Sequence, residues 1–240
     1  MTKKHPAADA GAVTMMNKAI EVEGLKKNFG SIEVLKEMDF EAGKGEIVGL
    51  LGPNGAGKST TIEILTGQID RDGGDVEVLG LDPGENPVKL REKLGILPER
   101  EDPPSFLTGT EYLDFVSDIR RDEVETGKWI DRMRLEGKMD KLTRALSKGE
   151  RQKLMIVQAF LHEPEAVFID EPMINLDPVV QEEIKNIFSE YSGTVFLCTH
   201  NVELAEEVCD SVLFIRDGRI IQKHDNLDEL KQNFLDAYDY

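Results

Sequence analysis

Cysteines and long apolar runs are scarce in these 240 residues. The two cysteines, Cys198 and Cys209, form neither a metal-ligand spacing nor a disulfide framework. Apolar runs such as residues 166–169 are far shorter than the roughly 18 residues that span a bilayer. Lys3 and Lys4 precede no apolar segment, which argues against a signal peptide. We therefore expect a chain that stays in the cytoplasm, with both thiols reduced and half-buried.

Basic residues are also in deficit. The chain has 29 Lys and Arg against 47 Asp and Glu, which gives a formal net charge of −18. This balance argues against nonspecific binding to nucleic acid or to an anionic membrane surface, because both would repel the chain. The acidic residues are dispersed along the sequence, so an ordinary solvated surface and adaptation to a salty cytoplasm both explain them.

The most specific motif is found at residues 52–60, which satisfy the pattern G-x-x-x-x-G-K-[ST]. An apolar, β-rich run at residues 46–51 precedes it, and a helical run at residues 61–65 follows. This context indicates a phosphate-binding loop (P-loop), although a glycine-rich turn with an exposed lysine is the alternative. The residues expected to bind a nucleoside triphosphate are Gly52, Pro53, Asn54, Gly55, Ala56, Gly57, Lys58, Ser59 and Thr60.

The chemistry expected around this loop involves five side chains. Lys58 should reach the β- and γ-phosphates, and the Ser59 hydroxyl should bind Mg²⁺. Asp170 and Glu171 end an apolar strand, which we expect beside the P-loop strand, so that Asp170 holds Mg²⁺ and Glu171 polarises an attacking water. His200 ends another apolar strand and is expected to contact the γ-phosphate. A helix cap or a surface histidine is the alternative reading of His200.

A second anion site is expected at residues 146–150, which read L-S-K-G-E and precede a helix at residues 151–161. Ser147 and the free N–H groups of that helix N-terminus would bind the anion. Two phosphate sites in one chain need an explanation.

Hydrophobic periodicity predicts strands that alternate with helices, as in a parallel α/β sheet. Two antiparallel strands are expected within residues 19–40, and a turn at residues 72–74 should precede a strand at residues 75–79. Helical periodicity after the Pro-rich loop at residues 98–104 predicts a helical insert, with Thr108 or Thr110 as an N-cap. The expected divisions are a disordered leader at 1–17, a core at 18–97 and 151–223, a helical subdomain at about 98–150, and a helical tail at 224–240.

These motifs resemble the nucleotide-binding domain of ATP-binding cassette (ABC) transporters over roughly residues 18–223. The resemblance rests on the P-loop, the L-S-x-G signature at 146–149, the acidic pair with Pro172, the loop at 175–178 and the pair Thr199-His200, in that order. It implies an α/β P-loop NTPase (RecA-like) core with an antiparallel β subdomain and a helical insert. It also implies a head-to-tail dimer, expected to be a homodimer, in which each signature faces the partner's P-loop and two ATP molecules are sandwiched.

The resemblance assigns further roles to single residues. It implies that Phe29 stacks on adenine, although a core aromatic is the alternative, that Ser147 and Gly149 contact the partner's ATP, and that Asp177 links the two sites. The family usually has Gln at the position of Glu99, where the side chain touches Mg²⁺. Glutamate can still ligate Mg²⁺, and we expect Glu99 to tighten metal binding. The signature also has Lys and Glu at positions 148 and 150, where Gly and Gln are commonest.

The function implied is an ATPase subunit at the inner face of the cell membrane that powers transport by separate membrane permease subunits. Residues 98–99 and 106–108 resemble export-type subunits, so we expect export. A soluble, non-transport ABC ATPase is an alternative, against which the single cassette and the acidity count. A nucleotide-gated switch is another, against which the intact Asp170, Glu171 and His200 count.

Overall fold

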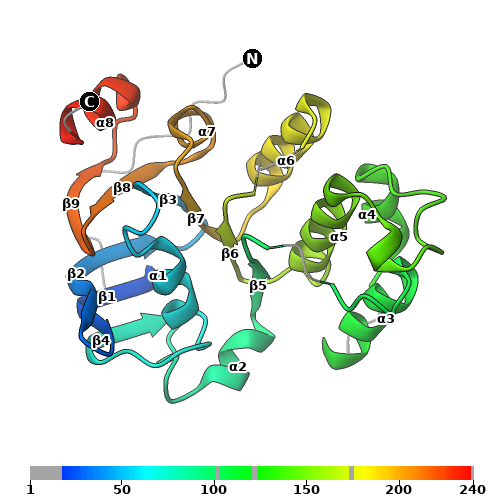
Figure 1. Cartoon of the computed structure of the whole chain (residues 1–240), viewed down its shortest axis with the longest axis horizontal. Coiled ribbons are helices and arrows are strands. Elements are labelled where there is room, and N and C mark those ends of the chain that lie inside the picture. The colour runs from blue at the N-terminus through cyan, green and yellow to red at the C-terminus, as the bar shows by residue number, and fades with distance from the viewer. Residues whose placement is uncertain (1–17, 101–102, 121–123, 173–175, 239–240) are drawn as a thin grey trace.

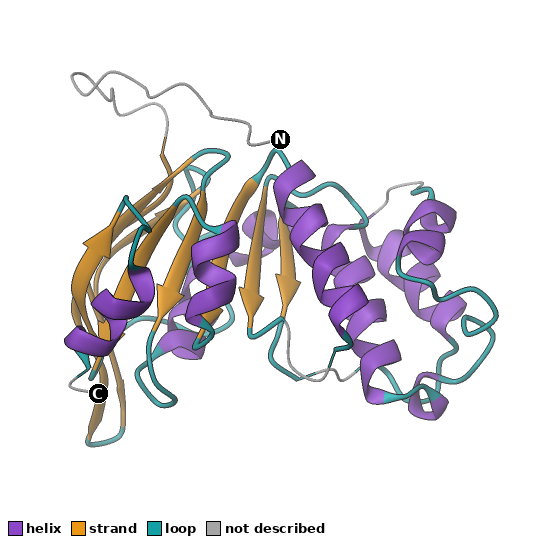
Figure 2. Cartoon of the chain, turned by 90° about the horizontal axis from the view of Figure 1, so that it is seen from above, coloured by secondary structure: helices purple, strands orange, loops and turns teal. Residues whose placement is uncertain are grey.

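The computed structural model describes residues 18–100, 103–120, 124–172 and 176–238. The expected disordered leader at residues 1–17 lies outside the described residues. In the described part, two sheets fill one end of the molecule and helices dominate the other (Figures 1 and 2). None of the described helices combines the length and apolar character needed to cross a membrane.

The smaller sheet is antiparallel and has the order β2-β1-β4. The larger sheet has the order β5-β6-β7-β3-β8-β9, and its neighbouring strands are parallel except for the β8–β9 hairpin. The strands are β1 (Lys18–Phe29), β2 (Ile32–Gly43), β3 (Ile47–Leu51), β4 (Gly73–Val78), β5 (Leu94–Leu97), β6 (Ala166–Asp170), β7 (Thr194–Thr199), β8 (Ser211–Arg216) and β9 (Arg219–His224).

The central strands are continuous apolar runs because both of their faces are covered. In β6, Phe168 packs into the core that the larger sheet shares with the antiparallel sheet, whereas Val167 and Ile169 point to the opposite core. The ring of Phe196 in β7 stacks on Phe40 of β2, with 5.6 Å between centroids. The two sheets are therefore joined through one buried cluster that also takes up one side of the helix after the P-loop.

The helices are α1 (Lys58–Leu65), α2 (Pro87–Glu92), α3 (Gly109–Arg120), α4 (Thr126–Arg132), α5 (Lys148–Phe160), α6 (Pro178–Glu190), α7 (Val202–Val208) and α8 (Leu230–Ala237). Helices α3, α4 and α5 gather at the end of the molecule away from the antiparallel sheet (Figure 1). Thr108 caps α3, because its Oγ1 accepts from the Glu111 N–H at 3.2 Å and the Glu111 carboxylate accepts from the Thr108 N–H at 2.8 Å.

Three local expectations need correction. Gly73 and Gly74 begin β4 and are no separate turn, since Gly74 passes so close to β1 that a Cβ would lie 2.4 Å from the Gly24 backbone. Helix α5 begins at Lys148, three residues earlier than predicted, because the Ser147 side chain caps it. Cys198 is fully buried in β7, whereas Cys209 is half-buried as expected.

Candidate functional site

The P-loop is a turn between β3 and α1 whose shape requires glycine. Gly55 and Gly57 have φ angles of 81° and 111°, which residues with a Cβ rarely adopt. A Cβ on Gly52 would lie only 2.3 Å from the carbonyl oxygen of Ile215 in β8. The loop therefore runs close to β8 and then opens α1, whose first N–H groups lack intrahelical partners and suit anionic oxygens.

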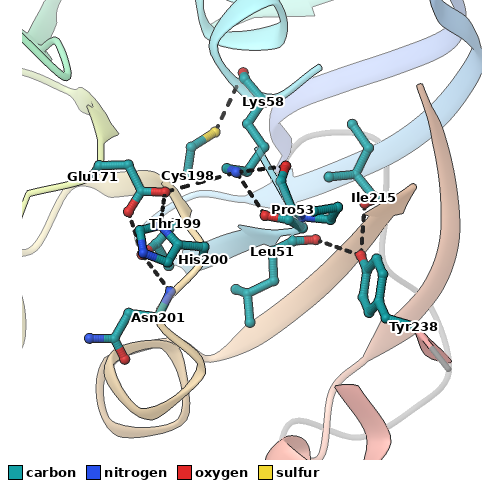
Figure 3. Close-up of polar contacts among 11 residues, drawn as sticks. Leu51, Pro53, Lys58, Glu171, Cys198, Thr199, His200, Asn201, Ile215 and Tyr238 are labelled. Atoms are coloured by element: carbon teal, nitrogen blue, oxygen red, sulfur yellow. Dashed lines mark hydrogen bonds and ion pairs between the residues drawn. The ribbon is translucent and has the colours of Figure 1, made fainter. Parts of the chain in front are cut away.

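The side chain of Lys58 is buried inside the loop (Figure 3). Its ammonium donates to the carbonyl oxygens of Gly52, at 2.7 Å, and Pro53, at 3.2 Å, and lies 3.9 Å from Glu171 Oε1. The positive charge is thus satisfied by neutral carbonyls and one carboxylate. The oxygens of a triphosphate carry far more negative charge than the two carbonyls, so they would compete successfully for this ammonium.

Glu171 is held by three partners at the carboxyl ends of the strands (Figure 3). Its Oε1 lies 2.7 Å from His200 Nδ1, and its Oε2 accepts from Thr199 Oγ1 at 3.0 Å. Its backbone has a positive φ of 50°, and its N–H donates to the Cys198 carbonyl oxygen at 2.9 Å. The carboxylate is almost fully buried and has a fixed direction, as a group that accepts a proton from a positioned water needs.

Asp170 reaches the P-loop by a different route from the one expected. Strand β6 is not the neighbour of the P-loop strand, because β7 lies between β6 and β3. Asp170 nevertheless lies close enough to Ser59, at the start of α1, for the serine hydroxyl to affect its titration. Burial raises the pKa of Asp170 to about 6, and the nearby carboxylates of Glu171 and Glu99 raise it as well, whereas the Ser59 hydroxyl and Lys58 lower it.

The residues present fit a nucleotide-bound Mg²⁺. Ser59, Glu99 and Asp170 line one pocket and offer hard oxygen ligands. Burial and, after it, the carboxylates of Glu171 and Glu99 disfavour the ionised form of Asp170, and a bound cation would favour that form. Within the described residues, no group of three or more His, Cys, Asp or Glu side chains could hold a metal ion by itself. A bound Mg²⁺ would therefore take most of its ligands from the phosphates and from water, as this ion usually does.

One pocket of about 590 Å³ collects most of the residues expected around the nucleotide. Phe29 stands at its edge with 49% of its surface exposed, and Lys27 Nζ lies 5.3 Å from the ring centroid. This position suits stacking on a base rather than core packing. The pocket is lined by Phe29, Val34, Asn54, Gly55, Gly57, Lys58, Ser59, Thr60, Glu99, Asp170, Glu171 and His200. Of the remaining P-loop residues, Gly52 and Pro53 line an adjacent pocket, and Ala56 is buried.

The signature residues Ser147 and Gly149 do not line this pocket. Ser147 caps α5, whose Glu150 N–H donates to Ser147 Oγ at 3.2 Å, while the Glu150 carboxylate accepts from the Ser147 N–H at 2.8 Å. Lys138 pairs with the same carboxylate at 2.9 Å, and this ion pair lowers the pKa of Glu150 to about 2. The Ser147 hydroxyl proton and the N–H groups of Lys148 and Gly149, the first two helical residues, remain available to an anion from outside.

Asp177 is the N-cap of α6, where its carboxylate accepts from the N–H groups of Val179 and Val180, both at 3.1 Å. It does not line the nucleotide pocket either. Asn175, the first residue of the loop at 175–178, lies outside the described residues.

Two residues of the site were not assigned a role from the sequence. Thr199 fixes Glu171, and its position as a polar residue at the end of an apolar strand was a signal that could have indicated it. Val34, in β2, forms part of the pocket wall, and nothing in the linear sequence distinguishes it from other strand valines.

Glu99 supports a test of the metal site. In Glu99→Gln, we expect the Mg²⁺ concentration for half-maximal ATP turnover to rise about fivefold, equal to roughly 1 kcal/mol, because a charged oxygen ligand becomes a neutral one. Titrating Mg²⁺ at fixed ATP measures this. Glu85→Gln, at an exposed acid outside the pocket, serves as the control. An unchanged Mg²⁺ dependence in Glu99→Gln would remove Glu99 from the metal site.

The comparisons with known proteins agree with this geometry. The family model described as ABC transporter matches residues 35–174. An ABC transporter ATP-binding protein of Bacillus subtilis is 34% identical over 217 residues, which cover 86% of this chain and 69% of that protein. A fluoroquinolones export ATP-binding protein of Mycobacterium tuberculosis is 36% identical over 213 residues, covering 84% of this chain and 69% of the relative.

A solved structure described as the ATP binding subunit of an ABC transporter has a TM-score of 0.83 and 31% sequence identity, and the match covers 90% of this chain and 93% of that one. The expected fold class, a P-loop NTPase core with an antiparallel β subdomain and a helical insert, is confirmed by this likeness and by the two sheets described above. The chain belongs to the ATP-binding proteins of the ABC transporter family.

Proposed function

We propose that this chain is the ATP-hydrolysing subunit of an ABC transporter and that two copies close around two ATP molecules. The observation that carries the proposal is the separation of the two anion sites. Lys58, Asp170, Glu171 and His200 line one pocket, whereas Ser147 heads a helix outside it. A second copy arranged head to tail would bring its Ser147 to the open side of that pocket and so complete the site.

The residues of the site have separate roles in ATP hydrolysis. Lys58 binds the β- and γ-phosphates and neutralises charge that develops on them. Glu171 Oε accepts a proton from the attacking water, while Thr199 and His200 hold the carboxylate in place. His200, whose side chain is 55% exposed, can in addition turn its second ring nitrogen toward the γ-phosphate. Mg²⁺, when bound by Ser59, Asp170 and Glu99, supplies charge neutralisation for the phosphate oxygens.

We propose that the permease docks on the α2–α3 side of the chain. Phe115 and Ile119 are large apolar side chains with 50% and 63% exposure, and they lie four residues apart on one face of α3. Phe106, in the loop before α3, and Val88, on α2, are also exposed. Exposed apolar side chains that adjoin one another, as Phe115 and Ile119 do on α3, are typical of partner surfaces. Export is the direction we propose, since a relative with 36% identity is named for export.

The dimer gives the direct test of this proposal. With ATP and Mg²⁺, the molecular mass in solution measured by light scattering should double for the wild-type chain, and Ser147→Arg should stay a monomer that still binds ATP. The bulk of an arginine side chain at this helix N-terminus fills the space that the partner's P-loop would occupy, and the position lies outside the chain's own pocket. Ser189→Arg, at an exposed serine near the end of α6, is the matched control. A Ser147→Arg variant that dimerises like the wild type would contradict the proposal.

A further inference from the structure

The C-terminal helix α8 is fastened to the sheet beside the P-loop. Leu230 is fully buried, and the rings of Phe234 and Tyr238 lie 5.4 and 6.1 Å from the ring of Phe214 in β8. Leu51, the last residue of the P-loop strand, belongs to the same buried cluster. The end of α8 is therefore packed against the carboxyl end of β3, where the P-loop begins.

The hydroxyl of Tyr238 reaches between two strands (Figure 3). It lies 2.7 Å from the carbonyl oxygen of Ile215 in β8 and 3.2 Å from the carbonyl oxygen of Leu51 in β3. Burial raises the pKa of this phenol, so the hydroxyl keeps its proton and acts as a donor. Because it has one proton and faces two acceptors, the shorter contact marks the stronger bond, to Ile215.

Both carbonyl groups are adjacent to Gly52, the first residue of the P-loop. Leu51 precedes Gly52, and the Ile215 carbonyl oxygen is the atom that a Cβ on Gly52 would approach to 2.3 Å. Gly52 in turn offers its carbonyl oxygen to the Lys58 ammonium at 2.7 Å. A continuous path of contacts thus runs from the Tyr238 hydroxyl through Ile215 and Gly52 to the cation that is expected to bind phosphate.

The outer turn of the P-loop does not pack directly against α8. A pocket of about 630 Å³ lies between this turn and α8, with Pro53 and Asn54 on one side and Phe234, Leu235 and Tyr238 on the other. Because this space separates the outer turn from the helix, α8 acts on the loop at its base, where the Tyr238 hydroxyl meets the two carbonyls.

We propose that Tyr238 is a positioning residue for the P-loop, which makes the C-terminal helix a determinant of nucleotide affinity. The hydroxyl fixes the carbonyl against which Gly52 packs, and thereby sets where the loop backbone and Lys58 meet the phosphates. This inference rests on the proposed ATP binding. It concerns the binding of nucleotide, not the proton transfer assigned to Glu171.

The test compares Tyr238→Phe with Tyr191→Phe in the full chain. Each variant loses a hydroxyl that donates to a backbone carbonyl: that of Ile215 for Tyr238 and that of Pro164 for Tyr191. Tyr191 precedes the first residue of β7, so it lies at the end of the sheet away from the P-loop. The dissociation constant of ATP, measured with a fluorescent ATP analogue in the absence of turnover, should rise about fivefold in Tyr238→Phe and stay unchanged in Tyr191→Phe. The KM for ATP should rise in parallel, with kcat at saturating ATP within about twofold of the wild type.

Each outcome separates one explanation from another. Wild-type affinity in Tyr238→Phe would overturn the inference and leave the proposed function intact. Equal weakening in both tyrosine variants would also overturn it, because a general loss of stability would then explain the effect. Failure of the wild-type chain to bind ATP would instead refute the proposed function itself.

Discussion

Replacing Glu171 by glutamine is expected to lower the rate of ATP hydrolysis by about two to four orders of magnitude, the usual contribution of a general base. The amide can still accept the Thr199 hydrogen bond and has nearly the same shape, so the pocket should keep its form. It can no longer take the proton of an attacking water. Release of inorganic phosphate under saturating ATP and Mg²⁺ measures the rate.

The same variant should bind ATP at least as well as the wild type. A carboxylate 3.9 Å from Lys58 Nζ competes with phosphate for that ammonium, and glutamine removes the competition. We therefore expect the ATP-bound dimer to accumulate. The control is Glu165→Gln, at an exposed glutamate just before β6, the strand that Glu171 follows. This variant should hydrolyse ATP normally. Equal rates for wild type and Glu171→Gln would leave no catalytic base at this position.

Replacing Asp170 by asparagine is expected to stabilise the nucleotide-free chain and to abolish its Mg²⁺-dependent turnover. The pKa of Asp170 is about 6 in the folded chain, against an ordinary value of 3.8 for an aspartate side chain. A raised carboxyl pKa favours folding below pH 3.8, and this contribution is lost as the pH rises through 6. At pH 8 the buried carboxylate thus costs about 2 to 3 kcal/mol of stability relative to its neutral form.

The stability effect has a pH signature that identifies its cause. Asparagine stays neutral, so the gain in the free energy of unfolding should be largest near pH 8 and should shrink toward pH 4, where the wild-type carboxyl is itself protonated. Urea unfolding without nucleotide and in the presence of a metal chelator measures the free energy of unfolding of both proteins at each pH. A variant that is less stable than the wild type at pH 8 would show that the favourable effects of Ser59 and Lys58 on the carboxylate outweigh its desolvation. The loss of turnover should persist at every pH, because an amide is a poorer Mg²⁺ ligand than a carboxylate.

The sequence by itself determined the elements and the chemical groups of this protein. The P-loop, the apolar strand that ends in Asp170 and Glu171, and the serine before α5 are local patterns, since φ preferences, side-chain alternation and capping act over a few residues. The resemblance to ABC proteins followed from the order of these motifs. Such patterns are independent of which element packs against which.

The tertiary structure alone decided which strands pair and which side chains contact one another. It placed β7 between β6 and β3, bonded Thr199 to Glu171, and brought Tyr238 to Leu51, 187 residues away in the chain. It also put Ser147 outside the pocket that holds Lys58. The strands β3, β6 and β7 are all buried apolar runs, and nothing in such a run specifies its partner strand. Only the packing of one sheet face against α5 and α6, and of the other against α1 and the antiparallel sheet, selects one order of strands, because it sums many weak contacts between distant segments.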